Sequence, residues 1–122
     1  MVDVTTDIEL ALTSISPELL KKVYAGITRA GYDVENRSDL GWGYVVVADE
    51  AVGDGLNDAL SKFLKDLSPF ADVIALSSPI IRVARFCTTY TCTTQLSHDN
   101  LSQLAKFQAA LEISVYPTSD ED

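Results

Sequence analysis

Two cysteines in a threonine-rich run are the first residues of this sequence that could do chemistry. Cys87 and Cys92 are five positions apart in "FCTTYTCTT" (86–94). In a regular strand that separation puts them on opposite faces, roughly 16 Å apart at about 3.3 Å per residue. A disulfide needs α-carbons within about 7 Å, so residues 88–91 would have to form a hairpin tip, which their types do not favour. We therefore expect two reduced, buried strand cysteines.

Other chemistries lack a complete set of residues. A zinc site needs four ligands, but the chain has one histidine and no Cys-x-x-Cys. His98 lies in "SHD" (97–99), yet a catalytic triad is assembled from separate segments. Ser97 and Asp99 are typical of a helix start, which leaves His98 on the surface. The acids of "DEAVGDG" (49–55) do not have calcium-loop spacing, and phosphate-binding motifs are absent. We predict no catalytic residues, no cofactor and no metal, hence no enzyme.

Two arginines on one predicted strand are candidates for a charged site. Arg82 and Arg85 differ in parity, so in a regular strand one of them faces inward. An arginine among apolar side chains needs a carboxylate or a bound anion. We expect an ion pair with Asp or Glu, or a position at the solvent-exposed end of the strand, and an anion-binding role for Arg82 or Arg85 stays open.

A second candidate set would bind a partner. Trp42 lies between two glycines and beside Tyr44, and an exposed tryptophan there would be an interaction hot spot. If Trp42 packs on the sheet instead, which we favour, it belongs to the core. The predicted partner-binding residues are Trp42, Tyr44, Asp49, Glu50 and Asp54.

The charge of the chain limits its partners. The 122 residues include 9 Lys and Arg against 18 Asp and Glu, a formal net charge of −9. Nucleic acids and anionic membranes attract clustered positive charge, so we expect neither, whereas a basic protein partner is compatible. No stretch approaches the roughly 18 apolar residues of a membrane helix. The N-terminal "MVDVTTDIEL" lacks the basic and apolar regions of a signal peptide, and we expect a cytoplasmic protein.

Hydrophobic periodicity predicts the elements that position these residues. Alternation predicts strands at 7–14, 32–36, 43–50 and 111–117, and the Val45–Val47 run indicates burial on both faces. Ser16, Pro17 and Gly31 delimit a helix over 16–31. A second helix is predicted over residues 53–72, with Asp54 as its N-cap and Pro69 at its end. A third helix is predicted from Ser97 to about Ala109. Residues 73–78 stay undecided, and 80–94 is a long strand or an irregular hairpin.

These elements repeat a strand-helix-strand unit. "ISPELLKKVYAGITRAGYDVEN" and "LSHDNLSQLAKFQAALEISVYP" share a serine cap, an amphipathic helix and a following strand. The pattern favours an α+β fold related to the ferredoxin-like class, with a mixed or antiparallel sheet, helices packed on one face, three helices and five to six strands. Residues 1–117 are predicted to form a single domain, and 118–122 ("TSDED") a disordered acidic tail.

The second half of the chain has a recognisable succession of elements. It begins with a strand led by Trp42 and Tyr44, followed by the helix "LNDALSKFLKDLSP", a long strand and "QLSHDNLSQLAKFQAALEISVY". Over roughly residues 40–116 this succession resembles the bacterial domain-of-unknown-function family 4279. The matching motifs are caps, core leucines and strand alternation. The resemblance implies a small α+β domain without a known activity. It also implies an immunity role, suspected for some such acidic domains that are encoded beside toxins.

Together these observations predict a non-enzymatic protein-binding module of the immunity or inhibitor type. An acidic surface can occupy a cationic groove and gains fast association by electrostatic steering. Two alternatives stay open. One is a small-ligand-binding domain or enzyme subunit that uses Arg82 or Arg85 with a carboxylate. The other is a structural module that forms oligomers, such as a homodimer.

Overall fold

A mixed sheet is built around one strand that is paired along its whole length. The computed structural model describes residues 4–48, 51–52, 55–87 and 94–117. Its strands are β1 (Val4–Leu12), β2 (Asp33–Asn36), β3 (Tyr44–Val47), β4 (Ala51–Val52), β5 (Pro79–Cys87) and β6 (Ala110–Pro117). The strand β1 pairs antiparallel with β3 and β4 on one side and with β5 on the other. The order is β2-β3-β1-β5-β6, in which β6 is parallel to β5, so β2 and β6 are the edges.

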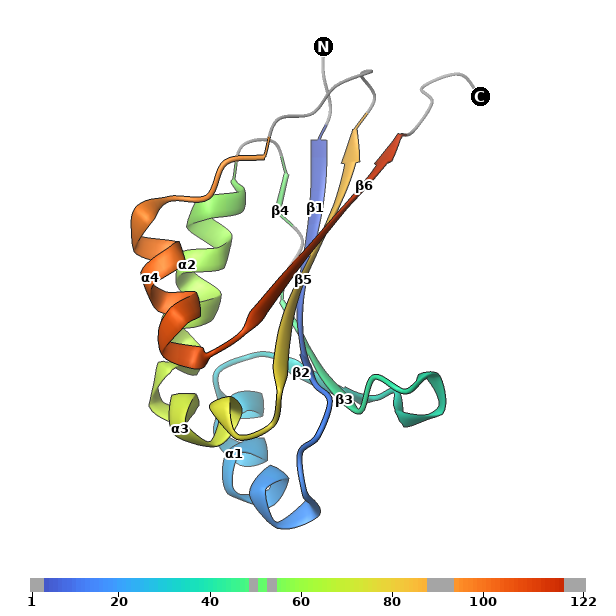
Figure 1. Ribbon diagram of the computed structural model, residues 1–122, viewed down its shortest axis with the longest axis vertical. Coiled ribbons are helices and arrows are strands. Elements are labelled where there is room, and N and C mark those ends of the chain that lie inside the picture. The colour runs from blue at the N-terminus through green and yellow to red at the C-terminus, as the bar shows by residue number, and fades with distance from the viewer. Residues whose placement is uncertain (1–3, 49–50, 53–54, 88–93, 118–122) are drawn as a thin grey trace.

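The helices cover one face of this sheet and leave the other open (Figure 1). They are α1 (Pro17–Arg29), α2 (Leu56–Leu67), the short α3 (Ala71–Ala75) and α4 (His98–Phe107), with 3-10 turns at Ser38–Leu40 and Ser68–Phe70. The predicted serine caps are confirmed, because Ser16 Oγ accepts from Leu19 N and Ser97 Oγ from Asn100 N, each at 3.2 Å. The longest of these helices has 13 residues, and none in the described ranges is long and apolar enough to cross a bilayer.

The connectivity confirms the predicted α+β fold class. From β1 through α1, β2, β3 and α2 to β5, the strand order β2-β3-β1-β5 is that of a ferredoxin-like sheet. The helix α4 then carries the chain over to β6, which extends the sheet by one parallel strand. Three longer helices and a sheet of five strands, with β4 beside β1, match the expected counts.

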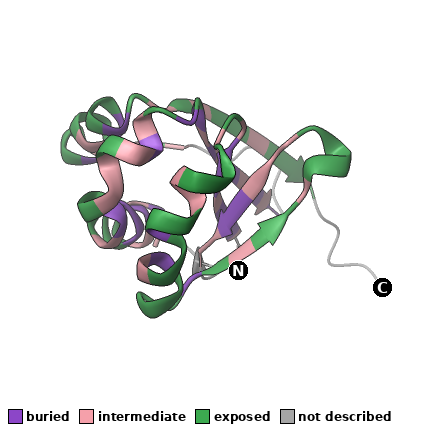
Figure 2. Ribbon diagram, turned by 90° about the horizontal axis from the view of Figure 1, so that it is seen from below, coloured by how far each residue is buried: buried purple, intermediate pink, exposed green. Residues whose placement is uncertain are grey.

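The core lies between the sheet and the helices, where buried residues gather in Figure 2. Alternation along β1 sends Ile8, Leu10 and Leu12 into it, each no more than 1% exposed. The core also contains Val23, Ile27, Val46, Leu60, Phe63, Leu64, Leu67, Ile74, Ile81, Val83, Leu104 and Phe107. Val45 and Val46 face opposite sides of β3 and are both fully buried, as the valine run predicted.

The structure decides some of the element boundaries that the sequence left open, and others lie outside the described residues. Residues 73–78 continue the helical region to Ala75 and end in a turn rather than a strand. Within 80–94, β5 ends at Cys87, and residues 88–93 lie outside the described residues. The helix α2 starts after Gly55, and its predicted cap Asp54 lies outside the described residues, as does the 118–122 tail.

The prediction that Cys87 is a free thiol is wrong. Cys87 is buried at the end of β5 and is disulfide-bonded. The other cysteine of the chain, Cys92, lies outside the described residues. A separation of about 16 Å between the cysteines requires one regular strand through both of them, but β5 ends at the first. The parity of strand residues therefore no longer applies beyond Cys87.

A polar contact ties the start of β2 to α2. Tyr32 is buried, its ring packs edge-on against Phe63 at 5.1 Å, and its hydroxyl donates to Asp66 Oδ2 at 2.6 Å. Lys62 Nζ donates to the same carboxylate oxygen at 2.9 Å. The hydrogen bond from Tyr32, then that from Lys62, lowers the pKa of Asp66 below its usual 3.8. Burial, followed by the bond to Asp66, raises the pKa of Tyr32 above 10.0.

We expect Tyr32→Phe to lower the free energy of unfolding at neutral pH by about 1 kcal/mol, because it removes one partly buried hydrogen bond. The lowered pKa of Asp66 stabilises the fold above the unfolded-state value, and this stabilisation is lost as pH falls through the folded-state value. Urea unfolding between about pH 7 and about pH 2 should show a smaller acid-side loss for Tyr32→Phe than for the wild type. Tyr24→Phe, at an exposed position of α1, should match the wild type.

The state of Cys87 gives a second test. Thiol titration of the unfolded, unreduced protein should find no free thiol, and reduction should release both cysteines of the chain. Two reactive thiols before reduction would contradict the disulfide. Protein kept in reductant throughout is the control for complete labelling.

Candidate functional site on the open face of the sheet

Charged and aromatic side chains gather on the face of the sheet that the helices leave open. The register aligns Asp7 with Ala84 and Glu9 with Arg82 across β1 and β5. The strand β6 adds Glu112 beside Arg82. A cavity of about 430 Å³ lies over these strands, within the usual size range of ligand pockets. It is lined by Asp7, Glu9, Arg37, Trp42, Arg82, Val83, Ala84, Glu112, Ser114 and Tyr116.

The turn after β2 brings Trp42 over this face. Arg37 N donates to Gly43 O at 2.7 Å, and Trp42 N donates to Arg37 O at 3.2 Å, which closes the turn around the Ser38–Leu40 segment. Gly41 and Gly43 have φ of 76° and 72°, in the left-handed region that favours glycine. A Cβ on Gly43 would lie 2.4 Å from Leu12 O, so the turn packs directly on the end of β1.

Arg82 is held between Trp42 and Glu112. Its Cζ lies 4.2 Å from the centroid of the Trp42 ring, and its Nε lies 3.6 Å from Glu112 Oε1. The arginine side chain is 17% exposed, and its Nε and Nη1 are buried without a hydrogen-bond partner in the described residues. A cation over a tryptophan face is stabilised electrostatically, which offsets part of this desolvation.

Arg37 closes the same side of the cavity with two carboxylates. Its Nη1 lies 3.1 Å from Glu9 Oε2, and its Nε and Nη2 both donate to Glu35 Oε2. The hydrogen bonds to Glu35, the largest cause, raise the pKa of Arg37. The positive charge of Arg37 is therefore balanced by the carboxylates of Glu9 and Glu35, and its ion pairs anchor the Trp42 turn to β1 and β2.

The far side of the cavity is more open. The small side chain of Ala84 leaves a hollow between Arg82 and Phe86, which are the next residues on the same face of β5. Asp7 and Ser114 flank it by register, and Tyr116, 48% exposed, stacks on Phe86 at 5.2 Å. Asp7 is exposed and has no ion pair within the described residues. The carboxylate of Asp7, which has no ion pair in this part of the chain, thus lines a hollow that the ring of Tyr116 also lines.

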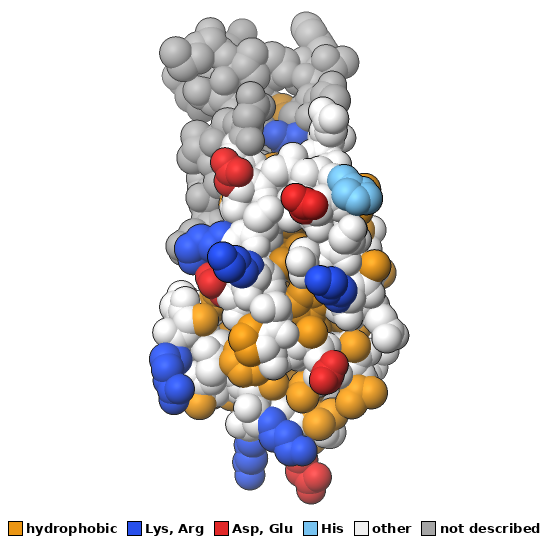
Figure 3. Space-filling view, turned by 90° about the vertical axis from the view of Figure 1, so that its left-hand side faces the viewer, with side chains coloured by type: hydrophobic (Ala, Val, Ile, Leu, Met, Phe, Trp, Pro, Cys, Tyr) orange, Lys and Arg blue, Asp and Glu red, His pale blue; other side chains and the backbone are white. Residues whose placement is uncertain are grey.

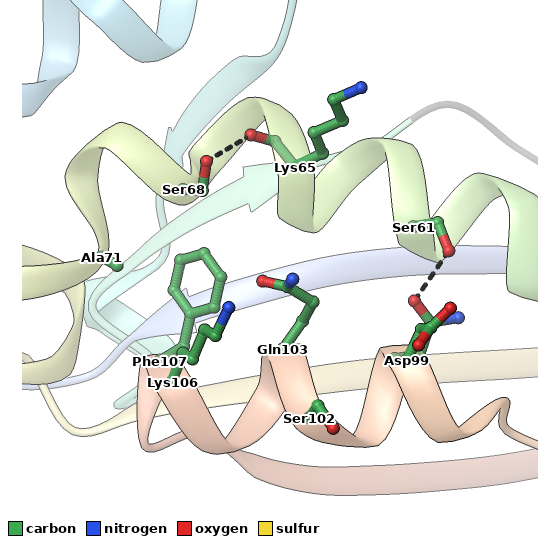
Figure 4. A pocket seen from close by; sticks show the side chains of 10 residues that line it. Ser61, Lys65, Ser68, Ala71, Asp99, Ser102, Gln103, Lys106 and Phe107 are labelled. Carbon is green, nitrogen blue, oxygen red and sulfur yellow. Dashed lines mark hydrogen bonds between the residues drawn. The ribbon is translucent and has the colours of Figure 1, made fainter.

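A larger hollow of about 620 Å³ lies between α2 and α4 on the helix layer (Figures 3 and 4). Ser61 Oγ donates to Asn100 Oδ1 at 2.8 Å across it. In the close-up, Gln103 and Phe107 point toward α2, whereas the Lys65 side chain points away from α4. Ser61 is bonded to Asn100, Ser68 Oγ donates to Lys65 O at 2.8 Å, and Lys65 is exposed, so most polar groups of this hollow do not converge on a ligand. We therefore place the candidate site on the open face.

The structure separates the residues that the sequence grouped. Trp42 lines the open-face cavity, but Tyr44 pairs with Leu12 and faces the helix side of β3. Asp49, Glu50 and Asp54 lie outside the described residues. The predicted parity of the arginines is confirmed: Arg82 lies on the open face, and Arg85 is 3% exposed on the helix side, donating to Thr94 Oγ1 at 3.0 Å. His98 is exposed on the first turn of α4, as expected.

Sequence reasoning missed the other lining residues. Asp7 and Glu9 alternate with core residues of β1, and Glu112 alternates with Leu111 and Ile113 of β6, so alternation could have assigned them to the open face. Arg37 gave no such signal, because its partner Glu9 is 28 positions away. Within the described residues, no group of three His, Cys, Asp or Glu side chains is arranged to hold a metal ion.

Comparison with family models, with curated proteins and with solved structures found no match. The function of the protein must therefore be inferred from the geometry of the site itself.

The two glycines of the Trp42 turn allow a matched test. Gly41→Ala, with no atom near its Cβ, should lose about 1 kcal/mol of stability from the positive φ alone. Gly43→Ala should lose at least about 1 kcal/mol more, because its Cβ meets the backbone of β1. Trp42 is the only tryptophan, so its emission should shift to the red in Gly43→Ala alone. Equal losses with unchanged emission would contradict this role of the turn.

Proposed function

We propose that this protein is a non-enzymatic module that binds a basic segment of a partner protein on its open sheet face. The observation that carries the proposal is the hollow over Ala84, which the carboxylates of Asp7 and Glu112 line together with the aromatic rings of Trp42 and Tyr116. Arginine side chains favour such places, because carboxylates accept their hydrogen bonds and aromatic rings stack on the guanidinium. Aromatic residues and arginine also dominate the binding energy of protein interfaces.

The distribution of charge supports a basic partner. Every lysine lies on a helix, whereas Asp7, Glu9, Asp33, Glu35 and Glu112 lie on strands and face the open side by alternation. The two arginines of this face are already paired with Glu9, Glu35 and Glu112. Excess negative charge therefore remains on the open face, where it would steer a cationic partner. An immunity or inhibitor protein that occupies a cationic groove is the concrete case.

A second candidate function follows from Arg82. Two of its nitrogens are buried without a hydrogen-bond partner in the described residues, and such groups often mark a site for a missing ligand. An acidic small molecule could satisfy them. The carboxylates around the cavity favour a basic partner over an acidic small molecule. A small-ligand-binding domain is therefore the second candidate.

The cellular location is a separate inference. The expected cytoplasmic location followed from the N-terminal sequence and implied reduced cysteines, but Cys87 is disulfide-bonded. Disulfides persist mainly in oxidising compartments, so the bond argues for such a compartment. The resemblance to family 4279 and a bacterial source stay predictions.

Trp42 emission can test the function directly. Titration with acetyl-Gly-Arg-Gly-amide should change the emission saturably, and the same peptide with neutral citrulline in place of arginine should not. Asp7→Asn combined with Glu112→Gln should weaken binding roughly 2- to 30-fold, since each partly exposed charge contributes up to about 1 kcal/mol. Asp58→Asn combined with Asp72→Asn, on the helices, is the matched control and should leave binding unchanged.

The titration also separates the candidates. No response to the arginine peptide would overturn the proposed function. A saturable response to acetyl-aspartate amide instead, lost in Arg82→Gln, would favour the acidic small-ligand site.

A further inference from the structure

We propose that β6 and the outer flank of α4 form an interface with a second copy of this chain. The two β6 strands would pair antiparallel about a two-fold axis, so that the sheet continues from one protomer into its partner. This inference does not rest on the proposed function. It rests on the contrast between the two edges of the sheet, on exposed apolar side chains beside one edge, and on the self-complementary sequence of that edge.

Only one edge of the sheet is protected against pairing. The edge strand β2 has four residues, and two of them, Asp33 and Glu35, are exposed acids. Short strands and charged side chains are the usual means by which proteins block an edge. The opposite edge strand β6 has eight residues, one charge at Glu112, and no proline before its last residue. Among the described residues β6 pairs with β5 alone, so the outward backbone groups of this edge are open to another strand.

Apolar side chains beside this edge are exposed to solvent. Ile113 and Val115, on the helix side of β6, are 39% and 48% exposed. On α4, the side chains that line the hollow toward α2 are those of Asp99, Asn100, Ser102, Gln103, Lys106 and Phe107. At 100° per residue, Leu101 and Ala105 lie on the flank of α4 that is turned away from α2, and Leu101 is 50% exposed. Exposed apolar side chains thus occur both on the helix side of β6, opposite the face that carries Glu112, and on the outer flank of the helix that precedes it.

The sequence of β6 is complementary to itself. With the two-fold axis at Ile113, this residue meets its own copy, and Leu111 meets Val115 of the second copy. Glu112 then faces Ser114 of the second copy, so like charges do not meet. The charge of Glu112 is also offset by Arg82 of its own chain at 3.6 Å. A basic partner segment would find a single, already paired carboxylate on this edge, which favours a second copy over such a segment.

Sedimentation of the wild-type protein tests the proposal. At about 100 µM we expect a dimer, and its fraction should rise between about 0.1 M and 1 M NaCl, because salt screens the repulsion between two chains of charge −9. Ile113→Lys and Val115→Lys, both at partly exposed positions, should raise the dissociation constant at least about tenfold. Leu76→Lys, at a 70% exposed position before β5, is the control and should dimerise like the wild type.

The register has its own test. Ser114→Lys should tighten the dimer roughly 2- to 30-fold by facing Glu112 of the second copy twice, and Ser114→Glu should weaken it by a similar factor. A protein that is monomeric at both salt concentrations overturns the proposal, even if the edge accepts a strand from another protein. A dimer that survives Ile113→Lys but not Leu76→Lys also overturns it. Arginine-peptide binding should weaken with salt, in the opposite sense, so the two proposals fail separately.

Discussion

The two-residue alternation of β1 is the constraint on which both faces of this protein depend. Because β1 is paired on both sides, its register with β3 and β5 cannot shift without breaking two ladders. A slip by one residue would turn Asp7 and Glu9 into the core and expose Ile8, Leu10 and Leu12. Burying two unpaired carboxylates is far costlier than the loss of a few backbone hydrogen bonds. The same alternation that builds the core therefore fixes the carboxylates on the open face.

The Trp42 turn completes the open face without belonging to the sheet. Ala11 and Val45 face this side by alternation, yet both are fully buried, so the face is not bare under the turn. The turn adds a tryptophan ring over Arg82 and an arginine beside Glu9. Partly buried ion pairs contribute little net stability, because desolvation opposes the attraction. The ion pairs of Arg37 and Arg82 instead fix the positions of the side chains on one side of the cavity. The side lined by Asp7 and Tyr116 has no such ion pair in the described residues.

Local signals allowed most of the fold to be predicted from the sequence, whereas the site depends on contacts between distant segments. Ser16 and Ser97 identify helix starts because each serine Oγ accepts a hydrogen bond from the backbone N–H three positions ahead. The parity of Arg82 and Arg85 needs only a regular strand, and β5 is regular over both. Trp42 reaches Arg82 across 40 residues of sequence, which no local pattern encodes. Tyr44 was grouped with Trp42 by proximity, but the two positive-φ glycines and the start of β3 direct them to opposite sides. Cys87 was misjudged because a strand end is the least visible feature of a β-rich run.

The geometry of the two proposals is connected through β6. This strand contributes Glu112, Ser114 and Tyr116 to the cavity and the exposed apolar side chains of Ile113 and Val115 to the edge. Antiparallel pairing about an axis perpendicular to the sheet keeps equivalent faces on the same side. Two cavities would then open in the same direction across a continuous sheet, close to the shared axis. A partner with two basic groups at matching spacing would engage both at once, and the second contact would form at high effective concentration. Two weak sites of exposed carboxylates would thereby bind such a partner more tightly than either site alone.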